Sequence, residues 1–135
     1  MIIALLIGFP MVSLISGIVL LLNLKNFLAD TPRIETEMDL EQFKKVVTYQ
    51  MYAALAQILL LGTPILIFAY GSFRGILSFS DVLYVVVPNT IIIIFSKFLR
   101  KYEKTGQSIP ASTPKLKSEV SSVIHTWKKK ALPNW

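Results

Sequence analysis

Two carboxamides inside long apolar runs are the residues of this sequence best placed to do chemistry. Gln57 lies in the uncharged run 46–73, and Asn89 lies in the uncharged run 82–96. A polar side chain in an apolar environment is costly unless it finds a hydrogen-bond partner. Both residues therefore predict hydrogen bonds between helices. Contact with a pigment or with a quinone headgroup is the alternative interpretation.

Other kinds of chemistry find little support in the residue types. The chain has no cysteine, which excludes disulfides, thiolate catalysis, iron–sulfur ligation and haem attachment through cysteine. His125 is the single histidine, and one histidine without a carboxylate cluster does not build a zinc site. Ligation of a pigment or haem by His125 is the alternative to a structural role. The sequence thus predicts a non-enzymatic protein without a metal or resident cofactor. Contact with a pigment or a lipid is compatible with these residue types.

Three uncharged runs must position the two amides, at residues 2–24, 46–73 and 82–96. A helix that crosses a bilayer needs about 20 apolar residues, and the third run reaches this length if Asp81 and Lys97 lie at the two interfaces. Only helices and closed barrels satisfy the backbone in lipid, and these runs do not alternate polar with apolar residues as barrel strands do. The sequence predicts an all-α integral membrane protein with three transmembrane helices. The first run is predicted to be a retained span and not a signal peptide.

Basic residues are confined almost entirely to one side of these spans. Of the 14 lysines and arginines, all but Arg74 lie in the loop 25–45 or beyond residue 96. The positive-inside rule places that loop and the tail on the cytoplasmic or stromal side, and the N-terminus outside or in a lumen. The net charge of +6 could suggest nucleic acid. Because the basic tail directly follows a membrane helix, the anionic headgroups of the lipid bilayer are the simpler partner, and no nucleic-acid binding is predicted.

The tail predicts a fourth, amphipathic helix. After a linker at 105–114, Thr113 and Pro114 supply an N-cap and a first helical residue for the segment 115–135. One face of that helix carries an apolar stripe, and three lysines follow it: Leu116, Val120, Val123, Ile124 and Trp127, then Lys128, Lys129 and Lys130. The pattern is typical of a helix that lies in the membrane surface. Docking of the same stripe on a partner protein is equally compatible.

Local signals predict where the spans begin and how they pack. Asp39, with Gln42 three positions later, is the predicted N-cap of a helix that runs into the second span. Ser80 is the predicted N-cap of the third span. The short connection at 71–80 predicts that the second and third spans form a tight antiparallel hairpin. Residues 1–104 thus form the three-helix region, followed by the linker and the basic tail.

Three stretches resemble small uncharacterised membrane proteins of cyanobacterial thylakoids. They are "EQFKKVVTYQMYAALAQ", "VVPNTIIIIFSKF" and "VIHTWKKKALPNW", within residues 41–135. The resemblance implies a thylakoid location and an accessory or assembly role near a photosynthetic complex. It transfers no site residues.

These observations favour a non-enzymatic accessory, assembly or stabilising subunit of a larger membrane protein complex. The reason is that a tail suited to docking follows spans that carry no catalytic or coupling residues. A proton- or sodium-coupled pump normally needs a carboxylate deep within the membrane, and Asp81 lies only at the edge of a span. The alternative is a small channel or transporter that works as an oligomer, with Gln57 and Asn89 lining its path.

Overall fold

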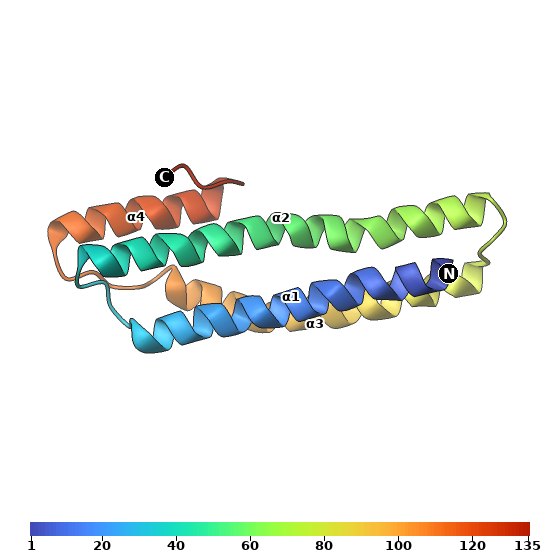
Figure 1. The fold of residues 1–135 in the computed structure, drawn as a ribbon, viewed down its shortest axis with the longest axis horizontal. Helices are drawn as coiled ribbons and strands as arrows, with labels where there is room; N and C mark the ends of the chain where they lie inside the picture. Colours follow the sequence, from blue (N-terminus) through green and yellow to red (C-terminus); the bar gives the residue numbers. More distant parts are fainter.

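The computed structural model describes all 135 residues and is all-α, as the sequence predicts (Figure 1). The helices are α1 (Ile2–Asp30), α2 (Glu37–Phe73), the 3-10 helix η1 (Phe79–Val82), α3 (Leu83–Gly106) and α4 (Pro114–Lys129). Three of them are long and apolar enough to cross a membrane: α1, α2, and α3 together with η1. At about 1.5 Å per residue α2 is about 55 Å long, nearly twice the hydrocarbon thickness of a bilayer. One end of α2 must therefore stand outside the membrane.

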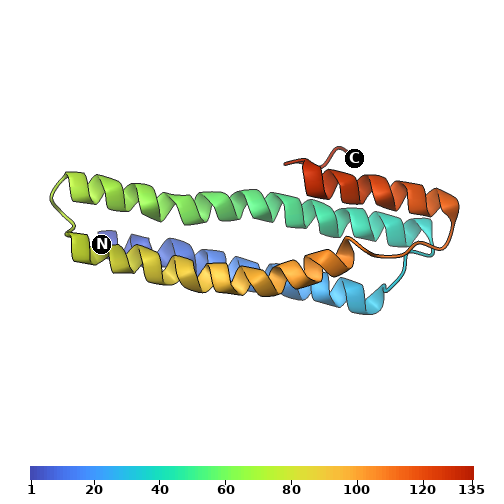
Figure 2. The same ribbon diagram turned by 180° about the vertical axis from the view of Figure 1, so that it is seen from behind.

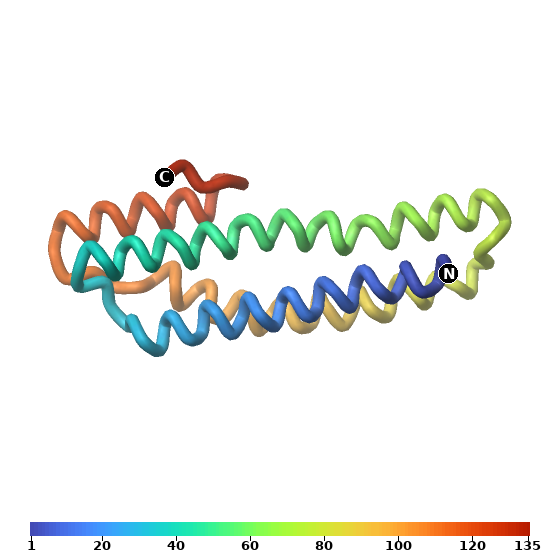
Figure 3. Tube along the Cα trace, viewed as in Figure 1, coloured from blue at the N-terminus to red at the C-terminus, as the bar shows by residue number.

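Of the three long helices, α1 and α3 run parallel to each other and antiparallel to α2, and both α2 and α3 pack against α1 (Figure 1). The helices α2 and α3 make few contacts with each other. Figures 2 and 3 show α1 and α3 side by side, with α2 running along them. The connection between α2 and η1 is as short as predicted, at residues 74–78. The two helices of the predicted hairpin, however, pack against α1 more than against each other, which the sequence pattern did not indicate.

The buried face of α1 has a heptad repeat. Its buried residues follow one another at alternating intervals of four and three: Leu6, Pro10, Ser13, Gly17, Leu20, Leu24 and Phe27. This spacing keeps one narrow seam on the same side of a helix that packs against near-parallel neighbours. Apolar residues off the seam, such as Val12, Ile15 and Val19, are exposed. Lipid is the solvent that such a surface requires.

The main hydrophobic core lies at the basic end of the molecule, outside the uncharged runs of α1 and α3. It contains ten buried residues from α1, α2, α4 and the two segments between helices: Phe27, Ile34, Leu40, Phe43, Val47, Met51, Ile109, Leu116, Val120 and Val123. A smaller cluster of Leu6, Leu77 and Val85 lies at the opposite end. The tail is thus part of one folded unit with the beginning of α2.

The loop 31–36 and the segment 107–113 are held together by backbone hydrogen bonds. The amide of Ile34 donates to the carbonyl oxygen of Pro110 at 2.9 Å, and the amide of Ser112 donates to the carbonyl oxygen of Ile34 at 2.9 Å. The Ile34 side chain is fully buried. Since α3 continues to Gly106, the non-helical connection is shorter than the predicted linker 105–114, and it is packed against the core. Loop and tail therefore lie at the same end, as the charge pattern predicted.

Both predicted N-caps of the spans are wrong, and a reciprocal box explains the first. Thr36 caps α2: its Oγ1 accepts from the Asp39 amide at 3.1 Å, and Asp39 Oδ2 accepts from the Thr36 amide at 3.2 Å. Asp39 is therefore the third helical residue and not the cap. Ser78, not Ser80, is the N-cap of η1, and its amide donates to Asp81 Oδ2 at 2.8 Å.

Candidate functional site

Gln57 joins α2 to α1 through a reciprocal pair of hydrogen bonds. The Ser13 hydroxyl donates to Gln57 Oε1 at 2.9 Å, and Gln57 Nε2 donates to the Ser13 carbonyl oxygen at 3.1 Å. Ser13 is fully buried on the α1 seam. Both halves of the Gln57 carboxamide are thereby used inside the uncharged runs. The interhelical hydrogen bonds predicted for Gln57 are present.

A glycine brings the third helix to the same level. A Cβ atom on Gly17 would lie 3.1 Å from the ring of Phe95 on α3 and 3.5 Å from Gln57 Nε2. The missing side chain therefore lets both neighbours approach α1 one helical turn beyond Ser13. We call Ser13, Gly17, Gln57 and Phe95 the intramembrane junction, since all three spans meet there.

Asn89 is not bonded to this junction. Its Oδ1 atom is buried on α3 and has no hydrogen-bond partner. Leaving a buried acceptor unpaired costs about 1–3 kcal/mol. The structure thus does not connect the two predicted site amides, and it leaves Asn89 with unused hydrogen-bonding capacity.

Gln50 is a further buried amide that the sequence analysis missed. Its side chain is only 2% exposed, and its Nε2 donates to the Leu20 carbonyl oxygen at 3.2 Å, whereas its Oε1 has no partner. Gln50 precedes Gln57 by seven residues, so both lie on the same face of α2. Its spacing, three residues after Val47 and seven before Gln57, was the signal available in the sequence. Tyr49 and Tyr52 flank Gln50, and tyrosine is typical of a membrane interface, so its immediate neighbours do not indicate burial.

The apolar stripe of α4 packs inside the chain, which corrects the prediction that it docks on lipid or on a partner. Leu116, Val120 and Val123 are buried in the main core with Phe43 and Val47 of α2. A stripe in water packs on the nearest apolar surface, and the extramembrane turns of α2 provide one. The surface that these three residues were predicted to offer is already covered.

Aromatic rings complete this contact. The Phe27 and Phe43 rings stack with centroids 5.9 Å apart, and the Trp127 ring meets Phe43 edge-on at 6.5 Å. Ile124 and Trp127 are only half-buried at the margin of the core. A Cβ atom on Gly106 would lie 3.3 Å from the Trp127 ring, so this glycine makes room for the indole.

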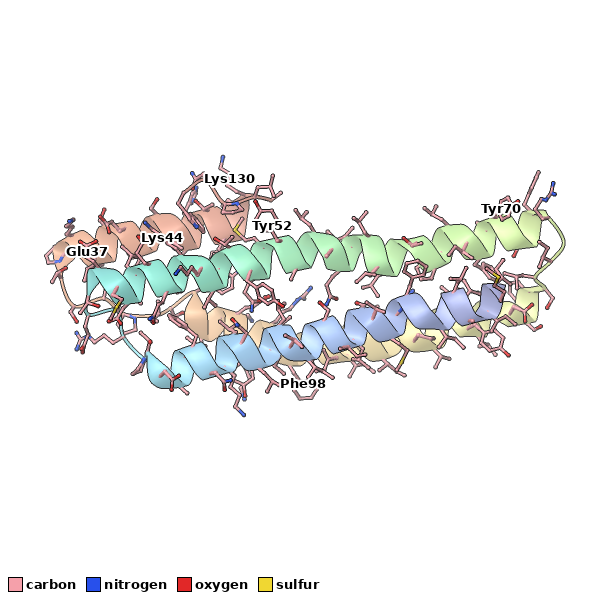
Figure 4. The ribbon with its side chains drawn as sticks, viewed as in Figure 1. Glu37, Lys44, Tyr52, Tyr70, Phe98 and Lys130 are labelled. Carbon is pink, nitrogen blue, oxygen red and sulfur yellow. The ribbon has the colours of Figure 1, made fainter.

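The polar face of α4 stays exposed and cationic. Its N-cap is as predicted, since Thr113 Oγ1 accepts from the Leu116 amide at 3.2 Å. The exposed residues after the stripe are Lys128, Lys129 and Lys130, and His125 is exposed as well. Figure 4 places Lys130 at the C-terminal end of α4, beside α2, and Glu37 at the other end of the pair. No three His, Asp or Glu side chains are close enough together to hold a metal ion.

One ion pair ties the first turn of α4 to the first turn of α2. Lys115 Nζ donates to Glu37 Oε1 at 3.0 Å, and both side chains are largely exposed. This hydrogen bond, with the charge of the same carboxylate, raises the pKa of Lys115 above its ordinary value of 10.5. Lys115 is therefore charged at every physiological pH.

Comparisons with protein-family models, with curated proteins and with solved structures find no match to this chain.

Proposed function

We propose that this protein is a non-enzymatic accessory subunit that stabilises a larger membrane protein complex or assists its assembly. The observation that carries this proposal is that α2 and α3 bury much less of their apolar surface within the chain than α1 does. In the most apolar windows, 28% of α1 residues are buried, but only 11% of those of α2 and of α3. Both outer helices therefore present apolar faces over most of their lengths, with side chains such as Leu59 and Leu66 each 71% exposed.

The polar groups inside the spans support the same proposal. Gln57 and Ser13 are used to hold α1 and α2 together, so the chain maintains its own fold while its outer faces stay free. Helices in lipid associate through close packing and through interhelical hydrogen bonds. Asn89 of α3 keeps a buried Oδ1 for which this chain supplies no hydrogen-bond donor.

The basic end supports a fixed orientation for this subunit. Loop, α3 end and α4 form one cationic body at one end of the spans, which we place on the cytoplasmic or stromal side by the positive-inside rule. The N-terminus then lies outside or in a lumen. The resemblance of residues 41–135 to thylakoid proteins extends the proposal to a thylakoid membrane and a photosynthetic complex.

The test is isolation of the tagged protein in a mild detergent, followed by native electrophoresis. We expect it to migrate within a larger complex, and to leave that complex when Ile93 on the outer face of α3 is changed to Trp. The matched control is Ile15→Trp on the exposed side of α1.

Two results would contradict the proposal. One is a protein that always migrates alone and whose deletion changes no membrane complex. The other is ion or solute flux in reconstituted liposomes that is abolished by Asn89→Leu, which would establish the oligomeric channel or transporter instead.

A further inference from the structure

A pocket with a volume of about 450 Å³ opens between α2, α3 and the C-terminal end of α4. Its polar residues come from all three helices and their C-caps: Gln50 of α2, Glu103 and the C-cap Gln107 of α3, and Lys128 and the C-cap Lys130 of α4. Two lysines against one glutamate give this pocket a net positive charge. The pocket lies where α2 and α3 leave the uncharged runs, which is the headgroup level of a bilayer.

On one wall of the pocket, Gln50 has a hydrogen-bond acceptor without a donor. The Gln50 carboxamide is held in place because its Nε2 is bonded to the Leu20 carbonyl oxygen of α1. The two branches of an amide point in different directions, so Oε1 faces away from that bond, and it has no partner in the protein. Gln50 and Glu103 thus contribute hydrogen-bond acceptors to the same lining as Lys128 and Lys130.

The rest of the pocket is apolar and leads toward the bilayer core. Ala54 and Ile58 follow Gln50 at intervals of four residues, so they continue the same face of α2 into the uncharged run. Eight residues of helix span about 12 Å, which carries this face from the headgroup level into the hydrocarbon. Ile58 is exposed, so an acyl chain can lie against it.

We propose that this pocket binds one anionic glycerophospholipid whose headgroup carries hydroxyl groups. The phosphate lies between Lys128 and Lys130, and the hydroxyls donate to Gln50 Oε1 and to Glu103. One acyl chain follows Ala54 and Ile58 along α2. A single negative charge neutralises the net charge of the pocket. This site is independent of the proposed role in a complex, because it is formed by this chain alone.

The test uses the full-length protein, delipidated in a neutral detergent and titrated with dioleoyl phosphatidylglycerol under native mass spectrometry. We expect one lipid to bind in preference to dioleoyl phosphatidylcholine, which has the same phosphate but no headgroup donor. Each lysine near an anionic lipid is worth about 1 kcal/mol, or about fivefold in affinity. The double variant Lys128→Gln, Lys130→Gln should therefore lose about 30-fold in affinity for phosphatidylglycerol.

Two matched controls separate this site from general attraction. Lys117→Gln with Lys129→Gln removes the same charge from exposed positions of α4 outside the pocket, and should change the affinity less than twofold. Ala54→Phe fills the apolar wall and should abolish lipid binding, whereas Ala56→Phe, exposed on α2 outside the pocket, should not. Retained circular dichroism and melting temperature show that each variant is folded.

Three outcomes would overturn the assignment. Equal loss in both lysine pairs would mean attraction by overall charge. Binding of phosphatidylethanolamine as tight as that of phosphatidylglycerol would remove the argument from net charge. Competition by inorganic phosphate or glycerol phosphate at the same concentration would mean a free-anion site without a role for the apolar wall.

Discussion

The basic end of this molecule and its membrane-spanning middle are held together by different means. At the basic end ten large apolar side chains form a core of the kind found in soluble proteins, with Phe43 fully buried at its centre. Between the membrane surfaces the helices meet through a serine, a glycine and an amide at the intramembrane junction. The difference follows from the solvent. Water drives apolar side chains into a core at the basic end, whereas in lipid the burial of apolar side chains gains no hydrophobic free energy, so close packing and hydrogen bonds hold the junction.

The largest test of this comparison is Phe43→Ala. Loss of a buried phenylalanine costs about 3–5 kcal/mol in a packed core, and here it removes the ring that Phe27 and Trp127 contact. We expect α4 to detach, so that trypsin cleaves it faster, while the spans stay helical. The control is Phe98→Ala: this ring lies on the outer side of α3 and is 61% exposed (Figure 4). Equal protease sensitivity in both variants would contradict a separate water-driven core.

The next test addresses close approach within the membrane. Gly17→Val places two methyl groups where Phe95 already lies 3.1 Å from the position of a Cβ atom, and overpacking of this kind costs about 1–3 kcal/mol. Unfolding in mixed detergent micelles measures the loss. Gly8→Val is the matched control, because no atom lies within 4 Å of a Cβ there. Rescue of Gly17→Val by Phe95→Ala would assign the loss to this contact, and a loss as large at Gly8 would refute it.

A smaller effect is expected from the hydrogen bonds of the junction. Hydrogen bonds between membrane helices are worth on average about 0.6 kcal/mol, so Ser13→Ala, which breaks one bond, should cost about this amount, and Gln57→Leu, which breaks two, about twice as much. In a double-mutant cycle Ser13→Ala should cost nothing further once Gln57 is leucine, since the hydroxyl bond that it breaks is already lost. Thr63→Val is the control, because the Thr63 hydroxyl donates only to the Leu59 carbonyl oxygen of its own helix.

The smallest effect is expected at the surface of the basic end. Lys115→Gln breaks the ion pair with Glu37, but both side chains are exposed, so melting between pH 7 and 9 should not change measurably. The raised pKa of Lys115 means that its contribution is fully present below pH 10.5 and is lost as pH rises through the higher folded value. A difference between variant and wild type that grows below pH 9 would contradict this assignment.

The sequence by itself determined the three spans and the end of the molecule at which loop and tail meet. Runs such as 46–73 have no alternative in lipid to a helix, and the segregation of lysine and arginine fixes which connections share a side. The start of α4 was also local, since Thr113 and Pro114 act on the turn that follows them. The start of α2 is local as well, but aspartate suits both the N-cap and the third helical position, and the sequence alone predicted the wrong one of the two for Asp39.

Only the tertiary structure decided what the amphipathic residues face. An apolar stripe such as Leu116, Val120 and Val123 is satisfied equally by lipid, by a partner or by another helix of the same chain. In the structure the stripe packs on α2, because the extramembrane turns of that helix, some 70 residues earlier in the sequence, lie beside α4. In the same way Ser13 and Gln57 are ordinary residues in isolation, and they form a pair because the seam of α1 brings them within 2.9 Å. Contacts between distant segments depend on packing geometry, which no local pattern contains.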